Sequence, residues 1–383
     1  MIEDRLKGDD EAKRLLEEAR TRLQGDPLRN ALAAFYLQAG RAGSGSVEFA
    51  HKSFGEFLCA GRIKDSLADW AQPGIRRQEF YIPTEQMDWE IYDLLGFGGL
   101  ATEIVEYITA YLDICSDLFD AEKIVRLFKR LEHFYLRWCD GEFIDAPPEN
   151  LPQKKMRLLK EQLPDRDVQT GQRQIDAATG LNVLILLLEL HHYANTNSNL
   201  RGKIIFFPCG QPDTPSFDNY RLLNIIGYSH CIHANSFNAL LGRFFQDANL
   251  SGANIRGTFL RRSNFKDANL TNTFLRGTFF LESNLSGADF SGAKLMGIFL
   301  INADLSNANL DSADLSSADL RGANLENANL NGANLTNILW NGQTNWEGVR
   351  GLEAAKNVPE ALKQQLENER LKRKNEKLGS ADE

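Results

Sequence analysis

The chain has few cysteines and no long apolar run. Five cysteines occur among 383 residues, scattered and odd in number, which argues against a disulfide framework and for reduced thiols in a cytoplasm. No run of about 18 apolar residues could span a bilayer. Residues 1–4 are not a basic start before an apolar core, so no secretory signal is expected. These absences predict a soluble, cytoplasmic protein of two or three domains.

Signals for catalysis or nucleotide binding are also missing. Gly40 and Gly45 have the spacing of a phosphate-binding loop, but Ser46 stands where that loop needs Lys, and no strand precedes it. His51 and Ser53 have no third group nearby that would complete a nucleophile, base and orienting residue. We therefore expect no enzyme and no cofactor.

What the sequence does have is a five-residue repeat, A-(N/D)-L-x-x, from Asn238 to Gly342. Its third position falls at every residue number divisible by five, from Leu240 to Trp340, and all 21 of these residues are apolar. The residue two before is Ala, Ser or Thr in 17 of them. A period of five fits neither a helix nor a flat strand. It fits a coil that stacks on copies of itself.

The segments Ala248–Gly252 and Ala308–Ser312 resemble pentapeptide repeats. That resemblance implies a right-handed, quadrilateral β-helix with four pentapeptides per coil. The repeat would then form about five coils, roughly 25 Å long at ~4.8 Å per stacked strand. With the helical patterns on either side, we predict an α+β fold: a mainly α-helical N-terminal region, the β-helix, and a C-terminal capping helix.

Some outward positions of the repeat are apolar instead of Asn or Asp, and they recur every 20 residues. We call the resulting surface the apolar ridge. It has two columns: Phe259, Phe279, Phe299 and Leu339 in the first, and Leu241, Leu281 and Ile301 in the second. Asp319, Arg261 and Arg321 interrupt it. Because large exposed apolar surfaces tend to be covered, we predict that the helical region or a second subunit docks there, although a bare stripe remains an alternative.

Residues 49–60 read F-x-H-x-S-F-x-E-F-L-x-A, with Phe54, Phe57 and Leu58 on one helical face. This stretch resembles the winged-helix and helical region that follows the ATPase core of NACHT-type NTPases of the STAND class. Residues 61–237 are similar to the helical regions before pentapeptide repeats in cyanobacterial-type NACHT proteins. The resemblance implies either the C-terminal part of such a protein or a relative that lost its motor.

Helical spacing of apolar residues predicts helices over residues 1–25, 90–112 and 121–140, with a turn or junction at Gly96–Gly99. Residues 181–190 are apolar almost all round and predict a buried core helix. Residues 146–152 are the best linker candidate. We predict four consecutive segments: a helical domain (1–150), a helical junction (151–237), the β-helix (238–342) and a cap (343–383), in which Pro359 starts a charged helix to Lys377.

Six histidines and cysteines lie within 43 residues and are the kind of side chain that binds zinc. They are His191, His192, Cys209, His230, Cys231 and His233. No C-x-x-C occurs and the spacings match no compact zinc motif, so satisfied core side chains are the favoured interpretation and no metal site is predicted.

Two functions remain open. The first is a non-enzymatic interaction or sensor module, in which a rigid coil binds a protein partner and the helical part belongs to a STAND-type protein. The second is a DNA mimic that binds a type II topoisomerase, as some pentapeptide-repeat proteins do. Residues 238–342 carry nine acidic and eight basic side chains, a net charge of −1. That field is too weak to imitate a phosphate backbone, so the mimic ranks second. Nucleic-acid and membrane partners are not expected.

Overall fold

The computed structural model describes residues 37–39, 47–49, 52–75, 79–146, 150–162 and 170–368. The chain forms two compact units. One contains the described residues up to Ser66 together with Ala101–Ile114, and the other contains Leu67–Leu100 and the chain from Cys115 onward. The helix predicted over residues 1–25, the Gly40–Gly45 segment and His51 lie outside the described residues.

The first unit combines a small sheet with helices. β1 (Leu37–Ala39) pairs antiparallel with β2 (Val47–Phe49). A strand therefore precedes Gly40, contrary to the expectation from the sequence, although Ser46 still stands where a phosphate-binding loop needs Lys. The first part of α4 (Lys52–Ala71) and the whole of α6 (Thr102–Ile114) follow. Phe57, one of the apolar residues of the NACHT-like stretch, meets the Tyr107 ring edge-on at 5.6 Å between centroids. That contact confirms an inward face for Phe57, while Leu58 on the same face is half-buried.

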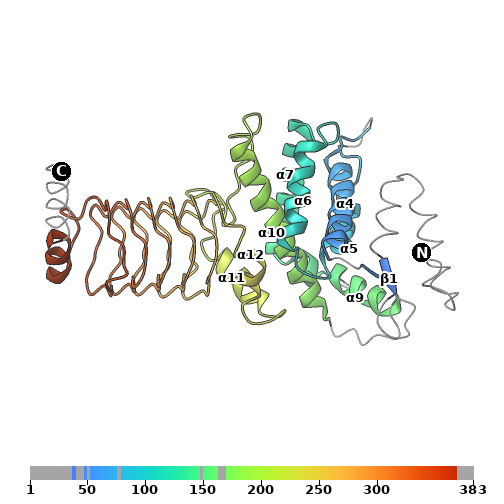
Figure 1. Ribbon diagram of the computed structural model, residues 1–383. Helices are drawn as coiled ribbons and strands as arrows, with labels where there is room; N and C mark the ends of the chain where they lie inside the picture. The colour runs from blue at the N-terminus through green and yellow to red at the C-terminus, as the bar shows by residue number, and fades with distance from the viewer. Residues whose placement is uncertain are drawn as a thin grey trace. The chain divides into compact units, whose positions relative to one another are not determined.

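The second unit begins with a helical layer built around one long helix. Its helices are α5 (Thr84–Leu95), α7 (Ala121–Cys139), α8 (Glu142–Asp145), α9 (Leu151–Gln162), α10 (Gln172–Thr196), α11 (Arg221–Ser229) and α12 (Ser236–Leu241). Figure 1 shows α10 among the other helices, and it packs on α5, α7, α9 and α11.

Helix α10 alone among the described helices is long and apolar enough to cross a membrane by length and composition. However, 89% of its most apolar window is buried inside the protein, as expected for a core helix. Residues 181–190 are buried as predicted, apart from a half-buried Glu189. The helix extends beyond these residues at both ends. Its full length was not predicted, because the flanking residues are more polar than residues 181–190.

Two predicted boundaries fall in the helical part of the chain. The helix expected over residues 90–112 is divided between α5 and α6, and the break falls at the predicted glycine junction. The Asn182 side chain holds that junction by donating to the Leu95 carbonyl at 2.8 Å and accepting from the Leu100 amide at 2.8 Å. The predicted domain boundary at residues 150 and 151 stays a prediction, and α9 packs on α5 and α10 within one unit.

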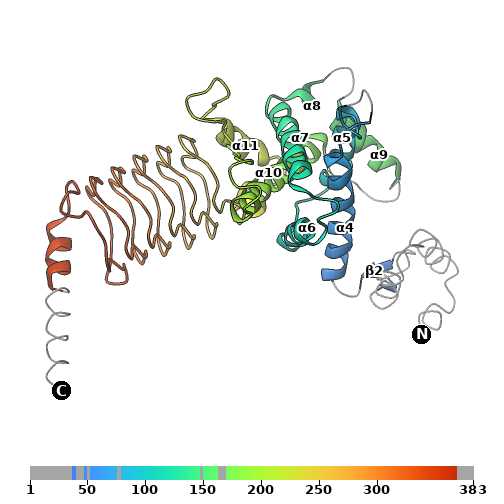
Figure 2. The same ribbon diagram turned by 90° about the horizontal axis from the view of Figure 1, so that it is seen from above.

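The C-terminal part of the second unit is a right-handed β-helix formed by the repeat. Parallel bridges join residues 20 apart, from Asn249 with Asn269 to Asp319 with Leu339. A coil therefore contains four pentapeptides, as the resemblance implies. Figures 1 and 2 show the coils following one another along a single axis. The prediction of about five coils stays a prediction.

Local chemistry explains why the repeat folds this way. The leucine position and the small position both point inward, and Leu310 and Ala308 are fully buried. Most buried hydroxyls at the small position bond to backbone carbonyls, as Thr273 Oγ1 does to Leu270 at 2.6 Å. The turn between neighbouring faces places every fifth residue at positive φ, for example Gly297 at 66°. Gly, Asn and Asp tolerate that conformation best, which accounts for their frequency there.

The coil begins and ends later than the repeat predicts. Leu240 lies in α12, and Leu241 is buried in the same helix rather than exposed on the ridge. At the other end the ladder continues past Gly342 to Lys356, since Asn324 bridges Asn345 and Asn334 bridges Lys356. One extra residue after Trp340 shifts the pattern, which is why the strict five-residue count stops too early.

The coil ends against a short helix. This helix starts at Glu360 and is described over residues 360–368, which confirms the first half of the predicted helix; the remainder lies outside the described residues. Leu362 is fully buried. Trp340 Nε1 donates to Gln365 Oε1 at 3.1 Å. These contacts close the last coil, where bare strand edges would otherwise be exposed.

Candidate interaction surface

The first column of the apolar ridge is a stack of three phenylalanine rings. Bridges align Phe259, Phe279 and Phe299 on successive coils. The ring centroids are 4.5 Å apart in the first pair and 4.4 Å in the second, with the planes inclined by only 10° and 3°. The stacking follows from the coil spacing, because each ring occupies the same position one strand further along. The β-helix therefore presents a rigid aromatic strip.

Asp319 interrupts the strip, as the sequence predicts. It bridges Phe299 on one side and Leu339 on the other. Arg321 holds its carboxylate with two bonds, at 2.9 Å to Oδ1 and 2.6 Å to Oδ2. The bond from Arg321 lowers the pKa of Asp319 below its ordinary value. Leu339 is thus separated from the phenylalanine stack by a charged pair, and the continuous apolar surface is the three rings.

The second column lies beside the rings. Leu281 and Ile301 are half-buried on neighbouring coils. A backbone hydrogen bond connects the two coils here: the Glu282 amide, next to Leu281, donates to the Ile301 carbonyl at 3.0 Å. Glu282 forms ion pairs with Arg261 and Arg262, the second at 2.7 Å. These charges border the apolar strip at its N-terminal end. An apolar centre with a charged rim is typical of protein interfaces.

The ridge remains open to solvent. Phe259 exposes 54% of its surface and Leu339 exposes 53%. Phe279 and Phe299 are half-buried, partly by each other. Docking of the helical region or of a second subunit on this surface stays a prediction.

The other faces of the coil are polar ladders. Asn329 donates to Asn309 at 2.9 Å and Asn334 donates to Asp314 at 2.9 Å, each across 20 residues. The sequence analysis missed one outward aromatic residue, Phe274, which is 43% exposed on a different face. It bridges Asn254 and Lys294, so it has no aromatic neighbour in its column and forms no second ridge.

The histidine and cysteine cluster does not come together. Within the described ranges, no group of three His, Cys, Asp or Glu side chains has a geometry suited to a metal ion. His191 and His192 instead join α10 to the first turn of the coil: His192 Nδ1 lies 2.6 Å from Asp247 Oδ2. Cys209 is buried, and burial raises the pKa of its thiol to about 11. His230 and His233 are exposed.

A basic face on α7 was not predicted from the sequence. Five side chains at helical spacing line one pocket: Arg126, Lys129, Arg130, His133 and Arg137. They are spaced by three and four residues, and side chains at these spacings lie on one face of a helix. The apolar periodicity of residues 121–140 drew attention to the opposite face, although the same periodicity applied to charge would have found these residues.

The fold defines a repeat scaffold whose outer side chains form columns along the coil. Residues 245–280, 263–300 and 300–337 match the family model described as pentapeptide repeats, in eight copies. The C-terminal part of the chain is therefore a pentapeptide-repeat β-helix.

Several solved structures are similar to part of the chain. One is a pentapeptide repeat protein (Rfr23) from the cyanobacterium Cyanothece 51142, with 35% identity over 27% of this chain and 66% of that chain, and a TM-score of 0.23. Another is HetL, a pentapeptide repeat protein involved in heterocyst differentiation regulation from Nostoc sp. strain PCC 7120, with 29% identity over 29% of this chain and 54% of that chain, and a TM-score of 0.20.

A third is QnrB1, a plasmid-mediated fluoroquinolone resistance protein, with 20% identity over 33% of this chain and 85% of that chain, and a TM-score of 0.17. The chain spans 66% and 54% of the lengths of the first two proteins. No curated protein matches the chain. The resemblance of residues 49–60 to NACHT-type proteins is not tested by these matches.

Proposed function

We propose that this protein is a non-enzymatic interaction module of the cytoplasm, in which the β-helix presents the stacked Phe259, Phe279 and Phe299 rings to a protein partner. The observation that carries the proposal is an ordered aromatic strip left partly open to solvent. Aromatic side chains are enriched at the energetic centres of protein interfaces. The rings are already held by the coil, so docking costs little side-chain entropy.

A second copy of the chain is the first partner to test. Light scattering should be measured over a range of concentrations on the wild type and on the triple variant Phe259→Asp/Phe279→Asp/Phe299→Asp. We expect the wild type to approach twice the monomer mass and the variant to remain a monomer. Burying three carboxylates against an apolar partner surface would cost several kcal/mol, which is enough to abolish a dimer.

A matched control places the same side chain at the equivalent position of another face. The control is the double variant Asn264→Asp/Asn284→Asp. Both residues belong to the outward column that contains Asp304. This control should behave as the wild type does in light scattering, and circular dichroism should show that both variants keep their helices and coil. A wild type that is monomeric at every concentration, or a control that dissociates equally, would contradict docking of two ridges.

We further propose that the helical region derives from the segment that follows the ATPase core in NACHT-type STAND proteins, so that the coil is the sensor or binding part of such a system. The support is the sequence of residues 49–60, together with the order of a helical region followed by pentapeptide repeats. An experimental structure of the whole chain in which residues before 60 form no winged helix would contradict this origin.

The alternative is a DNA mimic directed at a type II topoisomerase. The feature that favours it is a set of acids after residue 300: Asp304, Asp311, Asp314, Asp319 and Glu326. However, Asp319 is paired with Arg321, and the basic side chains of residues 238–342 leave that segment a net charge of only −1. The test is DNA supercoiling by a type II topoisomerase in the presence of micromolar amounts of this protein. Inhibition of the topoisomerase would support the mimic over the ridge proposal.

A further inference from the structure

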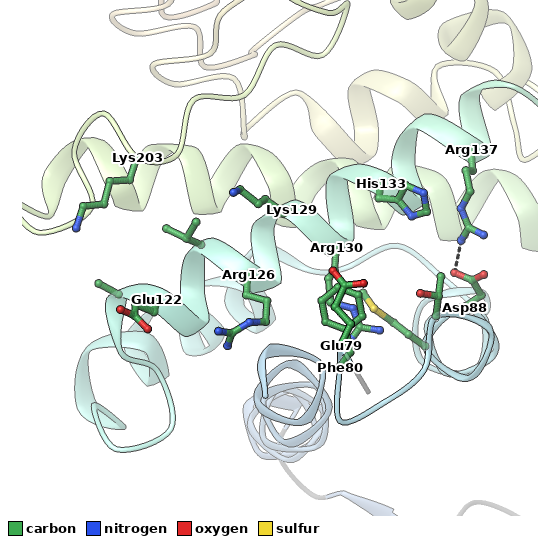
Figure 3. A pocket seen from close by; sticks show the side chains of 14 residues that line it. Glu79, Phe80, Asp88, Glu122, Arg126, Lys129, Arg130, His133, Arg137 and Lys203 are labelled. Carbon is green, nitrogen blue, oxygen red and sulfur yellow. Dashed lines mark hydrogen bonds and ion pairs between the residues drawn. The ribbon is translucent and has the colours of Figure 1, made fainter. Parts of the chain in front are cut away.

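A pocket of about 770 Å³ lies along α7 in the second unit. Its walls come from three separate segments: the approach to and first turns of α5, one face of α7, and the loop that carries Lys203. Figure 3 shows the Arg137–Asp88 ion pair at one end of the pocket and Lys203 at the other. This volume is in the range of pockets that enclose small organic ligands.

Cations outnumber carboxylates in the lining. Five permanently charged side chains line it: Arg126, Lys129, Arg130, Arg137 and Lys203. The carboxylates are three: Glu79, Asp88 and Glu122. The difference is a formal charge of +2, five minus three, on a chain whose net charge is −9. The pocket is thus a local reversal of the overall charge, and it attracts anions that the rest of the surface repels.

Two of the arginines form a fixed wall. Arg130 is buried and donates to the Trp70 carbonyl at 2.9 Å and to the Ile82 carbonyl at 2.6 Å. Its guanidinium also lies 4.2 Å from the centre of the Phe80 ring. Arg137 pairs with Asp88 at 2.5 Å, and its Nε is buried without a hydrogen-bond partner in the described structure. These contacts hold the charges in place before any ligand arrives.

The remaining cations keep donors available for a ligand. Lys129 and Lys203 are exposed and form no ion pair or side-chain hydrogen bond with the described residues. Arg126 donates one bond, to the Ala71 carbonyl at 2.7 Å, and keeps other N–H groups available. A ligand seated here would meet two ammonium groups and one guanidinium edge, with Phe80, Met87 and Val125 supplying apolar wall.

We propose that this pocket binds a small organic phosphate. Ammonium and guanidinium donors suit phosphate oxygens because several charge-assisted bonds converge on one group. The volume of the pocket and its apolar wall leave room for a compact organic portion. A long polyanion is disfavoured, because the net negative charge of the chain would oppose its extension beyond the pocket. This proposal does not depend on the apolar ridge.

Inorganic pyrophosphate is the probe, titrated into the whole chain by calorimetry at low ionic strength. We expect saturable binding of one pyrophosphate per chain. The variant Lys129→Ala/Lys203→Ala should weaken it at least about tenfold, since each charge-assisted bond is a substantial part of such an affinity. Added salt should weaken wild-type binding as well. Both lysines are exposed, so the melting temperature should stay unchanged.

The matched control is Lys160→Ala, which removes an exposed lysine from α9 outside the pocket. It should bind pyrophosphate as the wild type does. Two results would overturn the proposal: no saturable heat with millimolar pyrophosphate and wild-type protein, or equal affinities for the double variant and the Lys160→Ala control.

Discussion

The coil and the helical layer of the second unit satisfy their polar groups in opposite ways. In the coil, a polar side chain finds its partner one turn along, as Asn329 does with Asn309 across 20 residues. In the helical layer, Asp176 collects donors from three distant segments: Tyr92 at 2.5 Å, Trp138 at 3.0 Å and Tyr228 at 2.9 Å. Repetition makes the first kind of environment deducible from a single coil, whereas the second depends on the whole path of the chain.

That difference has an energetic consequence. A repeat protein distributes its stability over similar neighbouring contacts, so the loss of one ladder bond leaves the next coil intact. The helical layer concentrates several donors on one buried carboxylate. Burial raises the pKa of Asp176 in spite of the three bonds that lower it. A single substitution there should therefore affect more of the structure than one in a ladder.

The largest effect is expected for Asp176→Ala. It leaves the Tyr92 hydroxyl, the Trp138 indole and the Tyr228 hydroxyl without their acceptor, at a cost of about 1 kcal/mol or more for each stranded donor. We expect the free energy of unfolding of the helical layer to fall by about 3 kcal/mol. Urea unfolding followed by tryptophan fluorescence measures it, because Trp138 reports on this cluster.

Two controls define the result. Asp117→Ala removes an exposed carboxylate from the same unit. Asn329→Ala removes one ladder bond from the coil together with the bond that Asn329 accepts from the exposed Asn331 amide. Each should cost about 1 kcal/mol or less. If Asp176→Ala costs no more than Asn329→Ala, the contrast between a concentrated and a distributed polar network is wrong.

The same contrast explains what the sequence could predict. The inward Leu positions follow from the five-residue period. The 20-residue columns and the interrupting Asp319 follow from the four pentapeptides per coil that the family resemblance implies, since each coil repeats the environment of the last. The late end of the coil could not be predicted by counting, because one inserted residue after Trp340 shifts the register. The packing of α9 on α5 and α10 is likewise invisible to local pattern, since the Pro-rich stretch before α9 is equally typical of a domain linker.

For the candidate sites the outcome is similar. The phenylalanine column was predicted, and the structure stacks its rings. The α7 pocket was missed, because its charges come from segments separated in the sequence, such as Glu79 and Lys203. A search for basic residues at helical spacing would have found the α7 face. No local pattern could have placed Lys203 beside it.

The two regions meet at His192 and Asp247, where a pH-dependent contact joins helix to coil. The hydrogen bond with Asp247 raises the pKa of His192 above 6.5. The folded state therefore favours the protonated ring. Its contribution to stability is fully present below about pH 6.5 and is lost as the pH rises through the raised pKa. Both side chains are partly exposed, so we expect about 1 kcal/mol.

The contribution of His192 must be measured as a difference in stability between wild type and variant, because His191 changes stability with pH in the opposite direction. Burial lowers the pKa of His191, so that residue favours folding as the pH rises. The stability of wild type minus that of His192→Ala should be determined by thermal unfolding from pH 5 to 9, with the exposed His230→Ala as the control. A difference that grows with pH would show that the ion pair does not stabilise the junction.

The smallest effect on stability is expected within the coil itself, for substitutions at equivalent turn positions that carry different residues. Ser317 has φ of 59° and Gly297 has φ of 66°, and each amide donates to the next coil at 2.8 Å. A Cβ added to Gly297 would meet nothing within 4 Å. The substitution Gly297→Ala therefore isolates backbone strain and should lower the free energy of unfolding by about 1 kcal/mol.

The substitution Ser317→Gly relieves the same strain but gives the unfolded chain more freedom. We expect it to raise the free energy of unfolding by about 0.5 kcal/mol. Calorimetric melting of both variants should therefore shift in opposite directions. Shifts of the same sign would mean that the side chain at this position, rather than its left-handed backbone, determines the stability of the turn.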